Sequence, residues 1–392
     1  MAVETAPAPA PAGPSVVRTR PPWLDTLATQ AVALVSAFLF AGLTGALIIA
    51  AYGENPLFVY STMWQFSTAR PQDFARVLEN ATPLIFSGLA VAVAFKAGMF
   101  NIGVEGQYYV AMVTAASAAV FLDFLPGPVH LAAVVLAATM GSMFWAAIPA
   151  VLKVKTGAHE VVTTIMLNGI AVSLLAWALL NPLRTSETGL VDLRTDRFPE
   201  SALMPSLASS FRLEQHIPPS VHLTWLFPLA LVACVGVWFL LYRTRLGYEV
   251  RAVGTSAGSA EAGGISIGAT QIKIFLISGF LAGFVGLNHI LGDAGFLGVN
   301  YETALGFTGI AVAFLGRNHP AGIALAAILL GIMTRGEDGL AVSTELPREI
   351  VIILEGLLIL SVVIAYEISR RVLLRRRQRQ VRAEEGADSA AA

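Results

Sequence analysis

Ten apolar segments separated by short polar stretches limit the folds open to this sequence. A helix needs about 20 mainly apolar residues to cross a bilayer, and six segments reach that length: Leu27–Ala51, Val129–Leu152, Val161–Asn181, Leu223–Tyr242, Ile272–Leu291 and Ile350–Arg370. Four are shorter or broken by glycine: Pro83–Ala97, Gly106–Phe121, Leu305–Leu315 and Ala321–Thr334. Only 13% of the residues are charged, against about 25% in a soluble domain. The sequence predicts an all-α polytopic membrane protein of about ten transmembrane helices, some of the central ones short or broken.

The basic residues predict how these helices are oriented. Cytoplasmic segments of membrane proteins are enriched in Lys and Arg. With both termini in the cytoplasm, 17 of the 25 basic residues fall on the cytoplasmic side, seven of them between Arg370 and Arg382. The expected organisation is a disordered, Pro/Ala-rich cytoplasmic tail (1–26), a transmembrane domain (27–370) and a basic cytoplasmic tail (371–392). Within the domain, the loop 184–222 is expected outside and partly ordered, and the polar segment 243–271 inside.

One short sequence occurs twice. Residues 81–93 (ATPLIFSGLAVAV) and 302–314 (ETALGFTGIAVAF) share seven of thirteen positions. This similarity indicates either an internal repeat of the kind found in transporters or two helices that both use small residues to pack closely. The expected topology makes the two segments parallel, so their similarity does not establish an inverted repeat.

Catalytic and ATP-binding motifs are missing from the sequence. The stretch HEVVT at His159 lacks the second histidine of a zincin, Asp293 has no obvious carboxylate partner, and no Gly-x-Ser-x-Gly occurs. No lysine follows a glycine, so a P-loop is excluded. The single cysteine, Cys234, cannot form a disulfide within the chain, and a net charge of −1 gives no reason to expect nucleic-acid binding. We expect a transport protein without its own cofactor or metal. A stand-alone channel or facilitator is the alternative class.

Three motifs resemble one protein family. AFKAGMFNIGVEGQYYVAM (94–112), GAHEVVTTIMLNGIAVSLL (157–175) and TRLGYEVRAVGTSAGSAEAGGISI (244–267) are similar to segments of ABC importer permeases of the branched-chain amino acid and simple-sugar group, most of all the nucleoside members. The resemblance implies a type II-like permease of a bacterial plasma membrane that carries a nucleoside or similar neutral solute. A simple-sugar permease is the alternative. It also implies partners: a cytoplasmic ATPase that binds ATP and Mg²⁺, a second permease chain, and an extracellular or periplasmic substrate-binding protein.

The segment 243–271 is longer than a plain connection needs and therefore suits docking to the ATPase. Its small residues permit close approach, Ser256 or Ser259 is a candidate N-cap with Glu261 in the first turn, and Gly263 and Gly264 can end the helix. The residues expected to couple to the ATPase are Arg251, Gly254, Ser256, Ala257, Ala260, Glu261 and Gly264.

Polar side chains in two motifs are candidates for the solute pathway. Asn101 is expected to cap a helix that starts near Val104, with Glu105 in its first turn. Glu160, Thr164 and Asn168 are spaced i, i+4 and share a helical face. Capping and contact between helices are the alternative roles. The pathway candidates are Phe86, Asn101, Glu105, Gln107, Glu160, Thr164, Asn168, Asn288 and Phe307.

Overall fold

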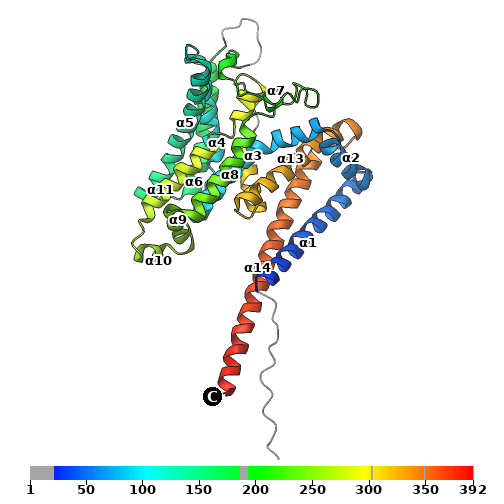
Figure 1. Ribbon diagram of the computed structural model, residues 1–392, viewed down its shortest axis with the longest axis vertical. Helices are drawn as coiled ribbons and strands as arrows, with labels where there is room; N and C mark the ends of the chain where they lie inside the picture. Colours follow the sequence, from blue (N-terminus) through cyan, green and yellow to red (C-terminus); the bar gives the residue numbers. More distant parts are fainter. Residues whose placement is uncertain (1–21, 186–192, 302, 348, 392) are drawn as a thin grey trace, which may run out of the picture. The chain divides into compact units, whose positions relative to one another are not determined.

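The chain folds into helices joined mostly by short connections (Figure 1). The computed structural model describes residues 22–185, 193–301, 303–347 and 349–391. The longer helices are α1 (Pro22–Ala51), α2 (Pro56–Thr68), α3 (Pro71–Lys96), α4 (Val104–Phe121), α5 (Gly127–Thr156), α6 (Glu160–Leu180), α8 (Leu226–Arg243), α11 (Ile267–Ala282), α12 (Leu305–Leu315), α13 (Pro320–Ser343) and α14 (Glu349–Ala391). The shorter ones are η1 (Glu200–Ala202), α7 (Leu207–Ser210), α9 (Arg245–Thr255), α10 (Ala257–Ala262) and a π-helix, η2 (Asn288–Asp293).

The described residues form two compact units. One comprises residues 43–359, and the other comprises the described residues up to Gly42 together with those from Leu360 onward. The larger unit holds every candidate residue of the sequence analysis. The smaller one consists of parts of α1 and α14.

Local sequence explains where several helices begin and end. Proline lies in the first turn of α2, α3, α5 and α13, where its missing N–H leaves no helical hydrogen bond unmade. The Asn55 side chain caps α2 by accepting a hydrogen bond from the Leu57 N–H at 3.0 Å. Gly157 ends α5 with a φ of +72°, a backbone conformation that glycine adopts without strain.

Each of the ten apolar segments coincides with at least one helix. Several boundaries differ from the prediction; α13, for example, continues to Ser343, beyond the predicted end at Thr334. Helix α1 begins at Pro22, so residues 22–26 of the expected disordered tail are helical. Helix α3 begins at Pro71 instead of Pro83, because its first turns carry polar residues that hydropathy does not recognise. The segment Ile272–Leu291 is not one helix, since α11 ends at Ala282 and the π-helix follows. Helix α2 was not predicted.

Several helices are long and apolar enough to cross a membrane. Within the described residues they are α3, α5, α6, α8 and residues 349–369 of α14. A sixth candidate is the pair of residues 35–51 and α2, which meet at a bend of 113°. The chain is therefore a multi-pass membrane protein. Residues 1–21, most of the expected N-terminal tail, lie outside the described residues. The expected C-terminal tail continues α14 as helix up to Ala391.

Helix α3 is the central element of the larger unit. Every residue from Ala81 to Ala94 is buried, as expected for a helix that is apolar on all sides. It packs against α12, and the two similar sequences lie at this contact. The Ser87 hydroxyl donates to the Leu305 carbonyl at 2.9 Å, and the Phe95 and Phe314 rings are 5.3 Å apart. The order of these contacts makes the two helices parallel. A side chain at Gly309 would collide with Ser87, so this contact requires a small residue, as the close-packing alternative expects. The contact is also compatible with an internal repeat.

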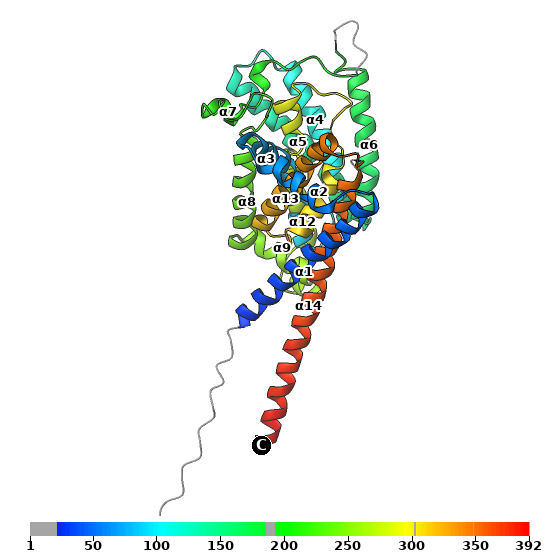
Figure 2. The same ribbon diagram turned by 90° about the vertical axis from the view of Figure 1, so that its right-hand side faces the viewer.

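The polar connections lie at opposite ends of the larger unit. Figure 1 shows α9 and α10 at one end and α7 toward the other, and Figure 2 shows the same separation. In the loop 184–222, the described residues hydrogen-bond to the segment after the π-helix. Thr195 N–H donates to the Leu297 carbonyl at 2.8 Å, and Phe198 N–H donates to the Gly295 carbonyl at 2.8 Å. The described part of this loop is therefore ordered, and residues 186–192 lie outside the described residues.

Candidate functional site

Two buried amides face each other where α4 begins. The Asn101 amide donates to Gln107 Oε1 at 3.1 Å, and the Gln107 amide donates back to Asn101 Oδ1 at 3.0 Å. Asn101 Oδ1 also accepts from the Gly103 N–H at 3.0 Å. The prediction that Asn101 caps α4 is wrong, because the N-cap is Gly103. Asn101 instead forms a turn before the helix, two residues too early to reach the N–H groups of the first turn.

The amide pair is tied to two further helices through Ser278 on α11. Asn101 Nδ2 donates to Ser278 Oγ at 2.8 Å, and Ser278 Oγ donates to the Ala90 carbonyl of α3 at 2.6 Å. All three side chains are almost completely buried. A fully satisfied buried network of this kind fixes the positions of its helices, because any displacement leaves polar groups without partners.

The Glu105 carboxylate holds the start of α12. It lies in the first turn of α4, as predicted, and is 3% exposed. Its Oε1 accepts from the Ala304 N–H at 2.7 Å, and its Oε2 accepts from the Gly306 N–H at 2.8 Å. These N–H groups lie at the N-terminus of α12, where a helix favours a negative charge. Ala304 adopts a φ of +66° at this point, a conformation that costs a non-glycine residue free energy.

Two tyrosines of α4 complete the surroundings of Glu105. The Tyr108 hydroxyl donates to Oε1 at 3.1 Å, and the Tyr109 hydroxyl donates to the same oxygen. Tyr301, in the loop before α12, packs edge-on against Tyr109 with ring centroids 5.1 Å apart. Burial and the neighbouring Glu105 charge raise the pKa of the Tyr301 phenol, so this loop residue adds no second negative charge.

Helix α6 contributes Asn168 and Glu160 to the same region. Asn168 Oδ1 accepts from the Gly106 N–H at 2.9 Å, and its amide donates to the Ile102 carbonyl at 3.1 Å. Asn168 therefore satisfies a first-turn N–H of α4 from a neighbouring helix. Glu160 forms an ion pair with Lys153 and accepts from the Phe100 N–H at 3.4 Å. The predicted common face of Glu160, Thr164 and Asn168 is confirmed, since all three are buried on α6.

We refer to Asn101, Glu105, Gln107, Asn168 and Ser278 as the α4 network. Every side-chain nitrogen and oxygen of its members has a hydrogen-bond partner within the chain. In this conformation the α4 network positions the starts of α4 and α12.

The other pathway candidates are not part of the α4 network. Thr164 Oγ1 donates to the Glu160 carbonyl of its own helix at 2.7 Å. Phe86 is buried and stacks on Phe284 with ring centroids 5.0 Å apart. Asn288, in the π-helix, accepts from the Thr224 hydroxyl at 3.3 Å. Phe307 is 47% exposed. Of the predicted pathway candidates, only Asn101, Glu105, Gln107 and Asn168, all from the NIGVEGQ and HEVVTTIMLN motifs, belong to the α4 network.

The segment 243–271 contains two short helices. Ser256 ends α9 and caps α10, with its Oγ accepting from the Ser259 N–H at 3.3 Å, so one of the two predicted N-caps is confirmed. The first turn of α10 contains no acidic residue. The expectation that places Glu261 there is wrong, because Ser256 as N-cap makes Glu261 the fifth helical residue. Gly263 is the C-cap, and Gly264 follows with a φ of +79°.

The residues expected to couple to the ATPase differ in their exposure to solvent. Ser256, Ala257 and Glu261 are exposed, so a partner can reach them. Ala260 is 4% exposed and packs within the chain. The Arg251 guanidinium lies over the Tyr242 ring, 5.5 Å from its centroid, and does not project outward. A partner that docks here meets the surface of α10.

Gly254 marks a close backbone contact between α9 and the end of α3. A Cβ atom on Gly254 would lie 2.2 Å from the Lys96 carbonyl oxygen and 3.1 Å from the Gly98 nitrogen. Lys96 and Gly98 lie five and three residues before Asn101 in the chain. Consequently, α9 touches the backbone that leads into the α4 network.

Sequence reasoning missed a buried ion pair at the start of α3. Asp73, which is 1% exposed, accepts from Arg335 of α13 at 2.9 Å and from Arg70 at 2.8 Å. Both Asp73 and Arg335 fall outside the predicted spans. The sequence could point to this ion pair only if α3 and α13 were already known to include Asp73 and Arg335.

The many apolar helices around a buried polar centre define a polytopic membrane protein, and comparison with known proteins specifies its type. Residues 74–363 match the family model described as branched-chain amino acid transport system / permease component. This chain belongs to that family, and it is a permease component of an ABC importer.

Three relatives are similar over most of their length. The guanosine ABC transporter permease protein NupP of Bacillus subtilis is 36% identical over 83% of this chain and 90% of its own. The glucose ABC transporter permease protein TsgB13 of Haloferax volcanii is 32% identical over 88% of each chain. The nucleoside ABC transporter permease protein NupB of Lactococcus lactis is 30% identical over 84% of this chain and 90% of its own.

Proposed function

We propose that this chain forms part of the membrane pathway for a nucleoside, and that a separate ATPase drives uptake. The similarity to guanosine and nucleoside permeases over more than four fifths of the chain carries this proposal. A simple sugar is the second candidate, favoured by the 32% identity to a glucose permease. Both solutes are neutral and polar and share a ring with several hydroxyl groups.

The proposed orientation places both chain termini and α9–α10 in the cytoplasm of a bacterial plasma membrane, with ten segments spanning it. The excess of basic residues on that side supports it. The separation of α7 from α9 and α10 in Figures 1 and 2 agrees with it. A second permease chain, identical or homologous, completes the pathway, and a substrate-binding protein delivers solute to the outer side.

The proposed transmission route begins at α10. The ATPase, which binds ATP and Mg²⁺, presses on the exposed face that includes Ala257 and Glu261. Helix α9 passes the motion to the backbone of Lys96 and Gly98 through the contact at Gly254. The α4 network then shifts the starts of α4 and α12 together, because Glu105 links them.

Competition for uptake tests the substrate. Cells or vesicles that contain the complete transporter take up labelled uridine, and excess unlabelled adenosine, ribose, glucose or leucine is added. Adenosine should reduce uptake at least tenfold, while ribose and leucine should not. Competition by glucose or ribose with no effect of adenosine would favour the sugar permease and reject the nucleoside assignment.

A second experiment separates an ABC permease from a stand-alone facilitator. Liposomes that contain only this chain should not take up uridine, and uptake should appear when the ATPase, the second permease chain and the binding protein are added with ATP. ATP-independent uptake by this chain alone would contradict the proposal. Glu261→Lys on α10 should lower ATP-dependent uptake without changing the amount of protein in the membrane.

A further inference from the structure

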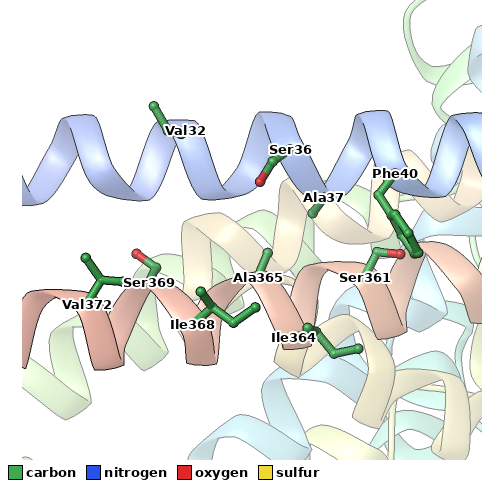
Figure 3. Close-up of a pocket in the computed structure, with 10 residues that line it drawn as sticks. All are labelled: Val32, Ser36, Ala37, Phe40, Ser361, Ile364, Ala365, Ile368, Ser369 and Val372. Carbon is green, nitrogen blue, oxygen red and sulfur yellow. The ribbon is translucent and has the colours of Figure 1, made fainter.

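The smaller unit contains an apolar groove between α1 and α14. The groove has a volume of about 500 Å³, within the range of about 300–1,000 Å³ typical of small-molecule sites. Figure 3 shows Val32, Ser36, Ala37 and Phe40 of α1 on one wall and residues of α14 on the other. The α14 wall is formed by Ser361, Ile364, Ala365, Ile368, Ser369 and Val372. Apart from Val372, the residues of both walls lie in segments that the sequence predicts to span the bilayer. The occupant of the groove is therefore expected to be apolar.

Ser369 indicates that the occupant also has a polar part. Its side chain is 5% exposed, and its hydroxyl has no hydrogen-bond partner in the part of the chain that the structure describes. In Figure 3 this hydroxyl points toward the α1 side of the groove. A buried hydroxyl without a partner is costly, and an ester or phosphate oxygen of a bound molecule would satisfy it.

The charge of the sequence indicates the head group of the occupant. Ser369 and Val372 lie at one end of the groove, opposite Val32 (Figure 3). Seven arginines occur between positions 370 and 382, directly after this end. Basic clusters that follow a membrane-spanning helix attract anionic lipid head groups, and basic pockets between such helices bind lipid phosphates.

We infer that the groove binds an anionic phospholipid, with an acyl chain between α1 and α14, an ester or phosphate oxygen at Ser369 and the phosphate beside the arginine run. The acyl chain covers the apolar walls, and the head group stays at the membrane surface. This site is separate from the α4 network, and it depends on the membrane location of α1 and α14 but not on the identity of the transported solute.

Native mass spectrometry of the full-length chain in detergent tests the site. Phosphatidylglycerol and phosphatidylcholine with the same acyl chains are titrated separately. We expect phosphatidylglycerol to bind at least tenfold more tightly, with one high-affinity molecule per chain. Equal affinity for the two lipids would overturn the proposal. Glycerol 3-phosphate, added as a competitor, should have no effect, and displacement of the lipid by it would show that the groove holds no acyl chain.

Matched variants locate the binding. Ala365→Trp fills the groove and should reduce phosphatidylglycerol binding to the phosphatidylcholine level. Val363→Trp adds the same ring to a position of α14 that does not line the groove, and should bind like the unmodified chain. Ser369→Ala should weaken binding several-fold. Replacement of the arginines at 375, 376 and 377 by Gln should remove the preference for phosphatidylglycerol and leave phosphatidylcholine binding unchanged. Unchanged phosphatidylglycerol binding by Ala365→Trp would reject the groove as the site.

Discussion

Glu105→Gln is expected to destabilise the larger unit, because Gln keeps the shape of the side chain but loses one acceptor oxygen. With the amide oxygen at the Oε1 position, the new NH₂ group faces the Gly306 N–H, now 2.8 Å from Oε2. A buried donor without an acceptor costs about 1–3 kcal/mol. The groups that donate to Oε1 would then bond to a neutral oxygen instead of a charged one, which adds to the loss of stability. Removing a buried charge offsets part of this loss. The expected net loss is about 1–3 kcal/mol.

The single cysteine provides the assay. Cys234 is 8% exposed, so a thiol-reactive fluorescent dye reports unfolding as the purified protein is heated. The Tm of Glu105→Gln should fall by several degrees. Glu261→Gln is the matched control, because Glu261 is exposed on α10 and surface substitutions usually change stability by less than about 0.5 kcal/mol.

A double-mutant cycle with Tyr109→Phe tests whether the loss arises from the hydrogen bonds of Glu105. Tyr109 donates to Glu105, so the two substitutions together should cost less than the sum of their separate effects. An unchanged Tm for Glu105→Gln combined with lost uptake would refute the structural role. That result would instead assign Glu105 to contact with the solute.

Three further predictions concern contacts between helices. Gly254→Ala should lower ATP-driven uptake at least severalfold, because its Cβ would lie 2.2 Å from a main-chain carbonyl of α3. Gly236→Ala on α8, with no atom within 4 Å of the added carbon, should leave uptake unchanged. Asn168→Asp should lower stability by about 1–3 kcal/mol in the thiol assay, because the carboxylate cannot donate to the carbonyl it faces. Asp73→Asn should cost about 1–3 kcal/mol, because Arg335 loses one of two carboxylate partners and keeps Asp338. An unchanged Tm in either variant would contradict its prediction.

The apolar helices can be predicted because a helix that crosses a bilayer must be long enough and apolar enough, and both properties are visible in the sequence. It does not predict α2 or the first turns of α3. Residues 71–80 include Asp73, Arg76 and Glu79, so the window looks like a loop. Burial of Asp73 against Arg335 depends on a helix more than 250 positions away, and no local pattern contains that information.

The same distinction applies to the candidate site. The i, i+4 spacing of Glu160, Thr164 and Asn168 predicts their shared face, because helical geometry is local. The cap assigned to Asn101 is wrong, because the N-cap of α4 is Gly103, and Asn101 Oδ1 accepts instead from the Gly103 N–H and the Gln107 amide. Neighbours within one motif can be predicted from their spacing. The hydrogen-bond partners of Asn101 and Glu105 on α11 and α12 can be found only in the three-dimensional structure.

In the proposed transmission route, a motion of α9 reaches α4 and α12 through a short series of direct contacts. Gly254 permits backbone contact with Lys96 and Gly98, so in this route a displacement of α9 acts directly on the main chain there. The displaced segment leads directly into Asn101, whose four hydrogen bonds leave it no freedom to move alone. Glu105 then binds α4 to the first turn of α12. Because tightly packed, fully hydrogen-bonded elements switch between discrete arrangements and do not deform gradually, α4 and α12 should move as one body when the ATPase acts.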